Sequence, residues 1–86
     1  MSELKGQFEQ AQKDVKTLTK RPVNEDLLAL YSLFKQATEG DAKGVRPGMF
    51  DMVGRAKYDA WSRLKGTSAE QAMKNYLGVV DKLLGR

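Results

Sequence analysis

The fold of this chain is decided by residues 31–68, which read YSLFKQATEGDAKGVRPGMFDMVGRAKYDAWSRLKGTS. Both ends of this stretch have the apolar spacing of helices, and both carry aromatic and lysine side chains. Between them, residues 39–50 contain three glycines and a proline, too many breakers for a regular element. We therefore expect two helices joined by one long loop, and a loop of this length in a compact domain is expected to be packed.

The flanking sequence predicts two further helices, because apolar residues recur there at spacings of three and four. The apolar face of the first helix is expected to contain Leu4, Phe8, Ala11, Val15 and Leu18. Pro22 disfavours a helical backbone at Arg21 and so separates this helix from the next. Ser68 followed by Gln71 resembles a capping box that opens the last helix. The inward face of that helix is expected to contain Ala72, Met73, Tyr76, Val80, Leu83 and Leu84.

Each of the two middle helices has a residue suited to cap it, Asn24 for the second helix and Asp51 for the third. The apolar face of the second helix is expected to contain Leu27, Leu28, Leu30, Tyr31 and Phe34. The stripe on the third helix is expected to contain Met52, Ala56, Ala60 and Leu64, with Trp61 beside it. Gly54 inside this helix costs about 1 kcal/mol relative to alanine, so we expect it to mark a close contact. The sequence thus predicts an all-α single domain of four helices over residues 1–86.

Composition describes a small domain that is stabilised by packing. A chain of 86 residues buries about 60–65% of the surface of its unfolded form. It contains neither cysteine nor histidine, which leaves no disulfide and none of the usual zinc ligands. Residues 1–10, MSELKGQFEQ, lack an apolar signal region, and no window has the roughly 18–20 apolar residues that span a bilayer. We expect a cytoplasmic protein, monomeric and without stable membrane insertion.

The missing histidine and cysteine also bear on function, because they exclude Ser-His-Asp and Cys-His catalysis. Neither of the glycine-rich phosphate loops GxGxxG and GxxxxGK[ST] occurs. The carboxylates Glu25 and Asp26 stand at a helix start, where the helix dipole explains them better than catalysis does. We therefore expect a binding protein that is not an enzyme and has no catalytic residue, cofactor or metal.

Two groups of residues could bind a ligand with an anionic group. Fifteen Lys and Arg against eleven Asp and Glu give a net charge of +4, which favours anionic partners. Tyr31 and Lys35 lie four residues apart and so share a helix face, where a hydroxyl and a charge could both meet a phosphate. Lys57 stands beside the apolar edge of the third helix. Spacing alone favours the structural interpretation, in which the tyrosine lies at the edge of the core and the lysine stems lie along apolar surface.

The segments YSLFKQATEGD, RPGMFD and GRAKYDAWSRLKGTS closely resemble, in order and spacing, the signature segments of the acyl-CoA-binding protein family. The resemblance runs over residues 8–76. It implies an up-down-down-up bundle, in which the loop between helices 2 and 3 permits the overhand connection. It also implies a ligand, long-chain acyl-CoA, and a role as a carrier. The chain departs from the family pattern at Met52 and Val53, where many members have an aromatic residue and a lysine, and at Tyr58, which replaces a frequent tryptophan.

The resemblance assigns roles to individual residues. Tyr31 and Lys35 match the tyrosine and lysine at the 3′-phosphate end of the ligand, and Lys57 matches a lysine that contacts coenzyme A. Tyr76 and Lys16 match the residues near the adenine and the head group. The predicted ligand-binding residues are therefore Lys16, Tyr31, Ser32, Leu33, Phe34, Lys35, Lys57 and Tyr76. The candidates for the acyl groove are Leu27, Leu28, Leu30 and Met52.

We therefore expect non-enzymatic binding and intracellular carriage or buffering of medium- to long-chain acyl-CoA esters. The alternative from a different class is a basic helical module that binds nucleic acid or a protein partner. Against nucleic acid, no helix has the surface rich in Arg, Lys and Asn that is typical of a recognition helix. The cationic residues are instead interleaved with acidic ones such as Asp14, Asp59, Glu70 and Asp81.

Overall fold

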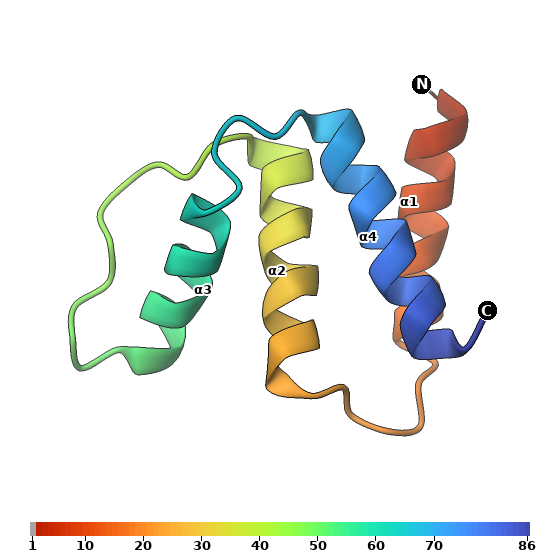
Figure 1. Cartoon of the computed structure of the whole chain (residues 1–86), viewed down its shortest axis with the longest axis horizontal. Coiled ribbons are helices and arrows are strands. Elements are labelled where there is room, and N and C mark those ends of the chain that lie inside the picture. The colour runs from red at the N-terminus through yellow and green to blue at the C-terminus, as the bar shows by residue number, and fades with distance from the viewer. Residues whose placement is uncertain (1) are drawn as a thin grey trace.

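The computed structural model describes residues 2–86 and contains four α-helices within them. They are α1 (Ser2–Val15), α2 (Asn24–Glu39), α3 (Met52–Ser62) and α4 (Ala69–Leu84). In Figure 1, α1 and α4 run downward whereas α2 and α3 both run upward, which is the predicted up-down-down-up order. The long loop makes this possible, because it returns the chain from the end of α2 to the level at which α2 began.

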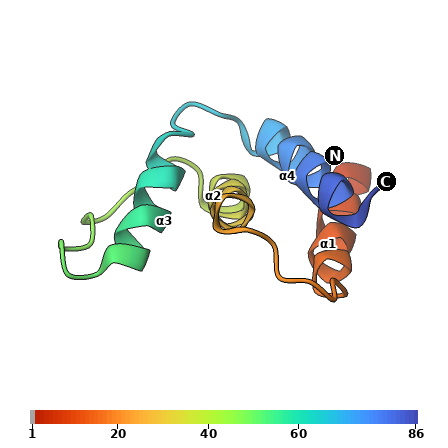
Figure 2. The ribbon, with the colours of Figure 1, turned by 60° about the horizontal axis from the view of Figure 1, so that its bottom comes forward.

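Helix α2 lies at the centre of the arrangement and packs against both α3 and α4, while α1 packs against α4. Figure 2 looks nearly along α2 and shows α3 on one side of it and the α1–α4 pair on the other. The resulting body is flat, with principal extents of 37 × 31 × 15 Å. Helix α3 is therefore at one edge, and among the described helices it contacts only α2.

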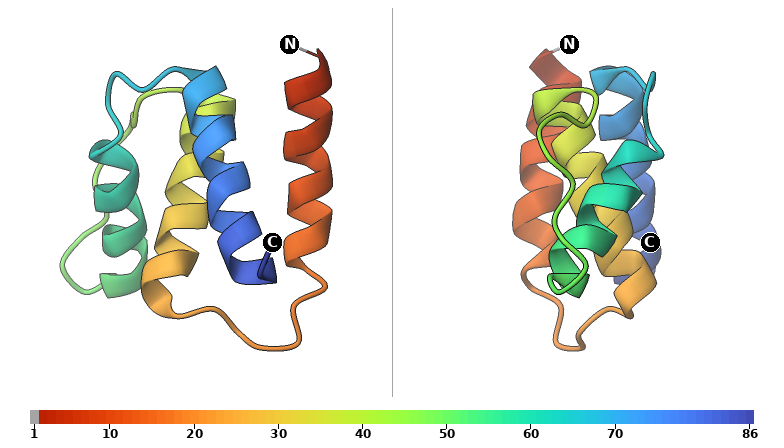
Figure 3. Two further views of the ribbon diagram at one scale, coloured as in Figure 1. Left: turned by 45° about the vertical axis from the view of Figure 1, so that its right-hand side comes forward. Right: turned by 90° about the vertical axis from the view of Figure 1, so that its left-hand side faces the viewer.

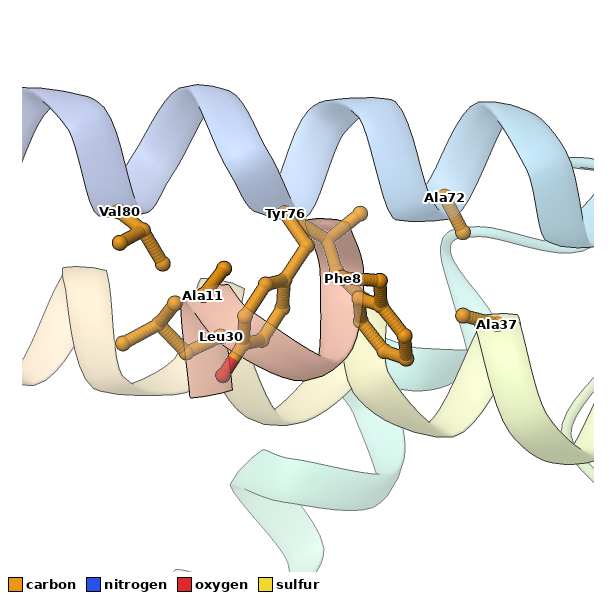
Figure 4. Close-up of a cluster of buried hydrophobic side chains, with 8 residues drawn as sticks. Phe8, Ala11, Leu30, Ala37, Ala72, Tyr76 and Val80 are labelled. Carbon is orange, nitrogen blue, oxygen red and sulfur yellow. The ribbon is translucent and has the colours of Figure 1, made fainter. Parts of the chain in front are cut away.

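The core lies between α1, α2 and α4 (Figure 4). The Phe8 ring meets the Tyr76 ring edge-on, with 5.0 Å between the centroids. Val80 and Ala72 are fully buried on α4. The predicted inward positions Phe8, Ala11, Leu30, Ala72, Tyr76 and Val80 are all in this core. Leu33 and Ala37 join them although the predicted stripe of α2 omitted both, and Phe34 is instead partly exposed.

The caps confirm two predictions and correct one. The Asp51 carboxylate accepts a hydrogen bond from the Gly54 N–H at 3.0 Å, and Ser68 Oγ accepts one from the Gln71 N–H at 3.0 Å. The capping box is only half formed, because the Gln71 amide donates to Asn75 instead of turning back. Asn24 does not cap α2: the N-cap position is Val23, and Asn24 already has a helical backbone.

Gly54 marks a close contact, as expected, and the contact is with the cap of its own helix. A Cβ atom at Gly54 would lie 2.8 Å from Cγ of Asp51, so any larger residue would push the capping carboxylate away. The predicted inward stripe of α3 is wrong at Met52 and Ala56, which are exposed. The reason is that α3, at the edge of the bundle, buries one narrow side and leaves its first turns open.

The loop between α2 and α3 is fixed by polar contacts to α3, and Figure 3 shows it running alongside this helix. The Trp61 indole N–H donates to the Gly40 carbonyl at 2.7 Å, and the Tyr58 hydroxyl donates to the Gly44 carbonyl at 3.2 Å. Arg46 forms a two-pronged ion pair with Asp59, with N–O distances of 2.8 and 2.7 Å. These contacts tether the loop to α3, but the prediction of a packed loop is wrong for its side chains, most of which are exposed.

Asp41 connects the ends of three elements. One carboxylate oxygen of Asp41 accepts hydrogen bonds from the Gly66 N–H and from the buried Gln36 side chain, both at 2.9 Å. The same Gln36 amide nitrogen donates to the Thr67 carbonyl at 2.8 Å. The end of α2 is thus joined to the connection between α3 and α4. Gly66 has a φ of +88°, a backbone conformation that favours glycine at this point of the turn.

This connection should make the fold sensitive to acid. The Gly66 N–H and then the Gln36 amide lower the pKa of Asp41 below its ordinary value of 3.8. Because the folded-state pKa is lower than the unfolded-state pKa, the stabilisation is present above the ordinary value and is lost as the pH falls through the folded-state value. When the pH falls from neutral to below 3.8, the melting temperature of Asp41→Asn should decrease less than that of the original chain.

The measurement is thermal unfolding followed by circular dichroism across this pH range. Glu70→Gln is the matched control, because Glu70 is an exposed carboxylate on α4 whose closest cation, Lys74, is 3.7 Å away. An acid-induced decrease in Asp41→Asn as large as that in the control would contradict the role given to Asp41.

Candidate functional site

An apolar groove of about 320 Å³ lies between the first turns of α2 and α3. Its apolar walls are Leu27, Leu28, Met52, Val53 and Ala56. Its polar rim is Arg21, Asn24 and Lys57. Because α2 and α3 run in the same direction, the beginnings of both helices meet here. The groove is open to water, since Met52 is 77% exposed and Val53 is 68% exposed.

Next along the two helices, a tyrosine on α2 meets a lysine on α3. Nζ of Lys57 lies 5.2 Å from the centre of the Tyr31 ring, within the range of a cation–π interaction. Lys57 is also a rim residue of the groove, so its charge stands at the point where the apolar walls end. The contact joins Tyr31 to Lys57, two predicted ligand-binding residues from different helices.

A second pair of the same kind follows about one turn further on. Nζ of Lys35 lies 4.9 Å from the centre of the Trp61 ring. Lys35 also forms an ion pair with Glu39 on the next turn of α2. The hydrogen bond to Glu39 raises the pKa of Lys35 above its ordinary value and lowers the pKa of Glu39. A ligand phosphate at Lys35 would therefore compete with the Glu39 carboxylate.

The structure brings some predicted site residues together along the α2–α3 interface and places others elsewhere. Tyr31, Lys35 and Lys57 lie along this interface, and Leu27, Leu28 and Met52 line its groove. Leu30 and Leu33 are buried in the core. Ser32 is buried as well, and its hydroxyl donates to the Ala29 carbonyl at 3.1 Å.

Three predicted residues lie nearer to α1. The Phe34 ring stacks on Phe8 with 6.0 Å between the centroids, and both border a second hollow of about 500 Å³. Tyr76 is 5% exposed within the core, and burial raises the pKa of its hydroxyl. Lys16 is exposed in the turn that follows α1 and is not among the residues that line the groove.

Four groove residues were not predicted as site residues: Arg21, Asn24, Val53 and Ala56. For Val53 and Ala56 the sequence held a signal, because both lie within one turn of Met52 on α3. For Arg21 and Asn24 the signal was indirect. Both precede or begin α2, and they border a groove only because the parallel arrangement brings the two helix starts together.

This arrangement suits an elongated ligand with an apolar part and an anionic part. The groove offers apolar walls, and two cations follow on the same interface. Across residues 2–86, no cluster of three or more His, Cys, Asp or Glu side chains has the arrangement of a metal site. Within the same residues, every helix is too short or too polar to cross a bilayer.

Comparisons with known proteins agree on one family. The family model described as acyl-CoA-binding protein matches residues 5–80. An acyl-CoA-binding domain-containing protein 6 of Arabidopsis thaliana is 52% identical over 94% of this chain and 88% of its own length. An acyl-CoA-binding protein homolog of Drosophila melanogaster is 45% identical over 93% of each chain. The crystal structure of Oryza sativa acyl-CoA-binding protein 2 is similar to this structure, with a TM-score of 0.93 and 43% sequence identity. The match covers 98% of this chain and 91% of the rice chain.

Proposed function

The chain belongs to the acyl-CoA-binding protein family. We propose that it binds and carries medium- to long-chain acyl-CoA esters and does not catalyse a reaction on them. The observation that carries the proposal is the order of side chains along the α2–α3 interface. Apolar groove walls come first, and the pairs Tyr31–Lys57 and Lys35–Trp61 follow. An acyl-CoA ester has the same order, with a tail at one end and phosphates at the other.

The tail is proposed to lie in the groove between Leu27, Leu28 and Met52. Each methylene taken from water contributes about 0.8 kcal/mol, so a long chain supplies around 10 kcal/mol before association costs. The exposed walls add to this gain, because the tail covers apolar surface of Met52 and Val53 that the free protein leaves in water. Tail length should therefore dominate the affinity.

The head group is proposed to meet Tyr31, Lys35 and Lys57, and the resemblance adds Lys16 and Tyr76 at the nucleotide end. Charge-assisted hydrogen bonds contribute about 1.5–3 kcal/mol when sheltered, whereas exposed ion pairs contribute about 0–1 kcal/mol. These lysines are partly or fully exposed, so each should contribute modestly. Together they distinguish a phosphorylated ester from a free fatty acid.

We further propose that the protein acts as a monomer in the cytoplasm, where it buffers or transports its ligand. The alternative of a basic module for nucleic acid or protein is not favoured. Several of its cations are already neutralised by neighbouring carboxylates, as in the pairs Arg46–Asp59, Lys82–Asp26 and Arg86–Asp14. Within residues 2–86, these pairs leave fewer free cations for the continuous basic face that nucleic acid binding uses.

The first test is a calorimetric titration with palmitoyl-CoA, free coenzyme A and palmitate. Binding of the ester should be stronger than binding of either half, because tail and head group engage one domain at once. A shorter ester should bind more weakly, and added salt should weaken the ester and coenzyme A by similar factors, because both ligands have the same phosphates. Equal affinity for all three ligands would reject the proposal.

A second prediction concerns the cation at the end of the groove. Lys57→Glu should weaken palmitoyl-CoA binding at least about tenfold, because a repulsive charge replaces an attractive one next to the phosphates. Its melting temperature should change little, since Lys57 is exposed. Lys74→Glu is the matched control, because Lys74 is an exposed lysine on α4 outside the interface. A loss of affinity in both variants would remove Lys57 from the site.

A third prediction follows from the ion pair that Lys35 makes in the free protein. Glu39→Gln should strengthen palmitoyl-CoA binding by up to about fivefold, because the phosphate no longer competes with a carboxylate for Lys35. The affinity for palmitate should stay the same. Weaker ester binding by Glu39→Gln would mean that Lys35 does not meet the ligand phosphate.

A further inference from the structure

Two exposed apolar side chains occupy the centre of a tight turn before α3. The Asp51 N–H donates to the Gly48 carbonyl at 3.0 Å, which closes a turn whose central residues are Met49 and Phe50. Turn centres are usually Gly, Pro, Asn, Asp or Ser. Here they are a methionine that is 67% exposed and a phenylalanine that is 97% exposed.

Met52 and Val53 continue this apolar surface into the first turn of α3, and both are also exposed. We call Met49, Phe50, Met52 and Val53 the apolar tip. Burial explains none of these four side chains, because the rest of the described chain does not cover them. Large apolar residues gathered at one exposed point are typical of a surface that meets a partner.

Cations stand on both sides of the apolar tip. Arg21 and Lys57 border the groove together with Met52 and Val53. Arg46 and Arg55 border a shallow hollow together with Met49 and Met52. Of the nearby carboxylates, Asp59 pairs with Arg46, whereas Asp51 caps α3 and keeps its negative charge. Arg21, Lys57 and the half-buried Arg55 add three positive charges beside the apolar tip.

We propose that the apolar tip docks the protein reversibly on anionic phospholipid surfaces. Met49 and Phe50 enter the headgroup boundary, and Arg21, Arg55 and Lys57 face the lipid phosphates. An apolar protrusion with flanking cations is the usual combination for interfacial binding, in which apolar burial and attraction to anionic lipid add together. A protein partner fits less well, because Met49 and Phe50 stand on an exposed turn and neither of them lines the apolar groove.

The apolar tip adjoins the groove, so docking would affect how the groove meets a lipid surface. The turn precedes α3 at the end of the molecule where α2 and α3 both begin (Figure 1), and Met52 and Val53 belong to both the tip and the groove. Docking would therefore bring the groove opening to the lipid surface, where acylated molecules partition. This last step rests on the proposed function, whereas the docking itself does not.

The test is cosedimentation of the full chain, without acyl-CoA, with phosphatidylcholine vesicles that contain phosphatidylserine or lack it. The protein should bind the anionic vesicles, and bind pure phosphatidylcholine more weakly. Met49→Ser combined with Phe50→Ser should lower the partition coefficient at least about tenfold, since two apolar side chains no longer enter the interface. Arg55→Gln should lower it about fivefold.

Two controls keep this test separate from folding and from ligand binding. Val45→Ser removes an apolar side chain that is 93% exposed in the same loop but borders neither hollow, and it should leave vesicle binding unchanged. The Met49/Phe50 double variant should titrate with palmitoyl-CoA in solution as the original chain does, because neither residue lines the groove. Normal vesicle binding without ester binding would therefore contradict the proposed function and leave the docking intact.

Absence of binding to anionic vesicles would overturn the proposal, as would equal binding to vesicles of both compositions. An equal loss in Val45→Ser would also overturn it, because the tip would then have no special part. Self-association that disappears in the double variant, without vesicle binding, would assign the tip to a second copy of the chain.

Discussion

The packing of α3 on α2 is the contact on which the site depends. Among the described helices α3 contacts no other, and Trp61 is its one buried side chain. The indole fixes this contact in two ways, because its N–H donates to the Gly40 carbonyl and its face receives the Lys35 ammonium. The loop adds the Arg46–Asp59 and Tyr58–Gly44 contacts to the same helix. A groove wall on an edge helix is thus fixed mainly by directional polar contacts.

The parallel direction of α2 and α3 explains why the site is ordered along its length. Residues spaced by four on each helix line the groove or make the two cation–ring contacts: Leu27, Tyr31 and Lys35 on α2, and Val53, Lys57 and Trp61 on α3. Four residues advance about 6 Å along a helix. The residues of the two series therefore lie at matching levels from the groove to Lys35. In an antiparallel pair the apolar start of one helix would face the polar end of the other. The long loop is therefore a requirement of the site as well as of the fold.

Much of the fold could be predicted from the sequence because the strongest signals are local. Spacing identified four helices and most of the core, and Asp51 and Ser68 cap the helices that they were expected to cap. The wrong predictions concern properties that depend on neighbours. Asn24 lost its cap role because the helix begins one residue earlier than that role requires, and Met52 faces water because nothing packs against the first turn of α3.

The same distinction applies to the site. The Tyr31 and Lys35 pair could be predicted, since four-residue spacing fixes a shared face. The contact between Tyr31 and Lys57 could not, because it depends on how two helices pack. Arg21 was missed for a related reason: it borders the groove only through the relative placement of a linker and α3.

The exposed apolar residues of α3 connect stability with function. A helix that buried Met52 and Val53 against its own protein would be held more firmly, but the groove would then be filled by the chain itself. At about 25 cal/mol per Å² of apolar surface, leaving such side chains in water forgoes stabilisation that a bound tail can supply. In the proposed complex the tail gains by leaving water, and the groove walls gain with it. Part of the binding energy would then be packing energy that the free fold leaves unused, so ligand occupancy and the stability of α3 on α2 would rise together.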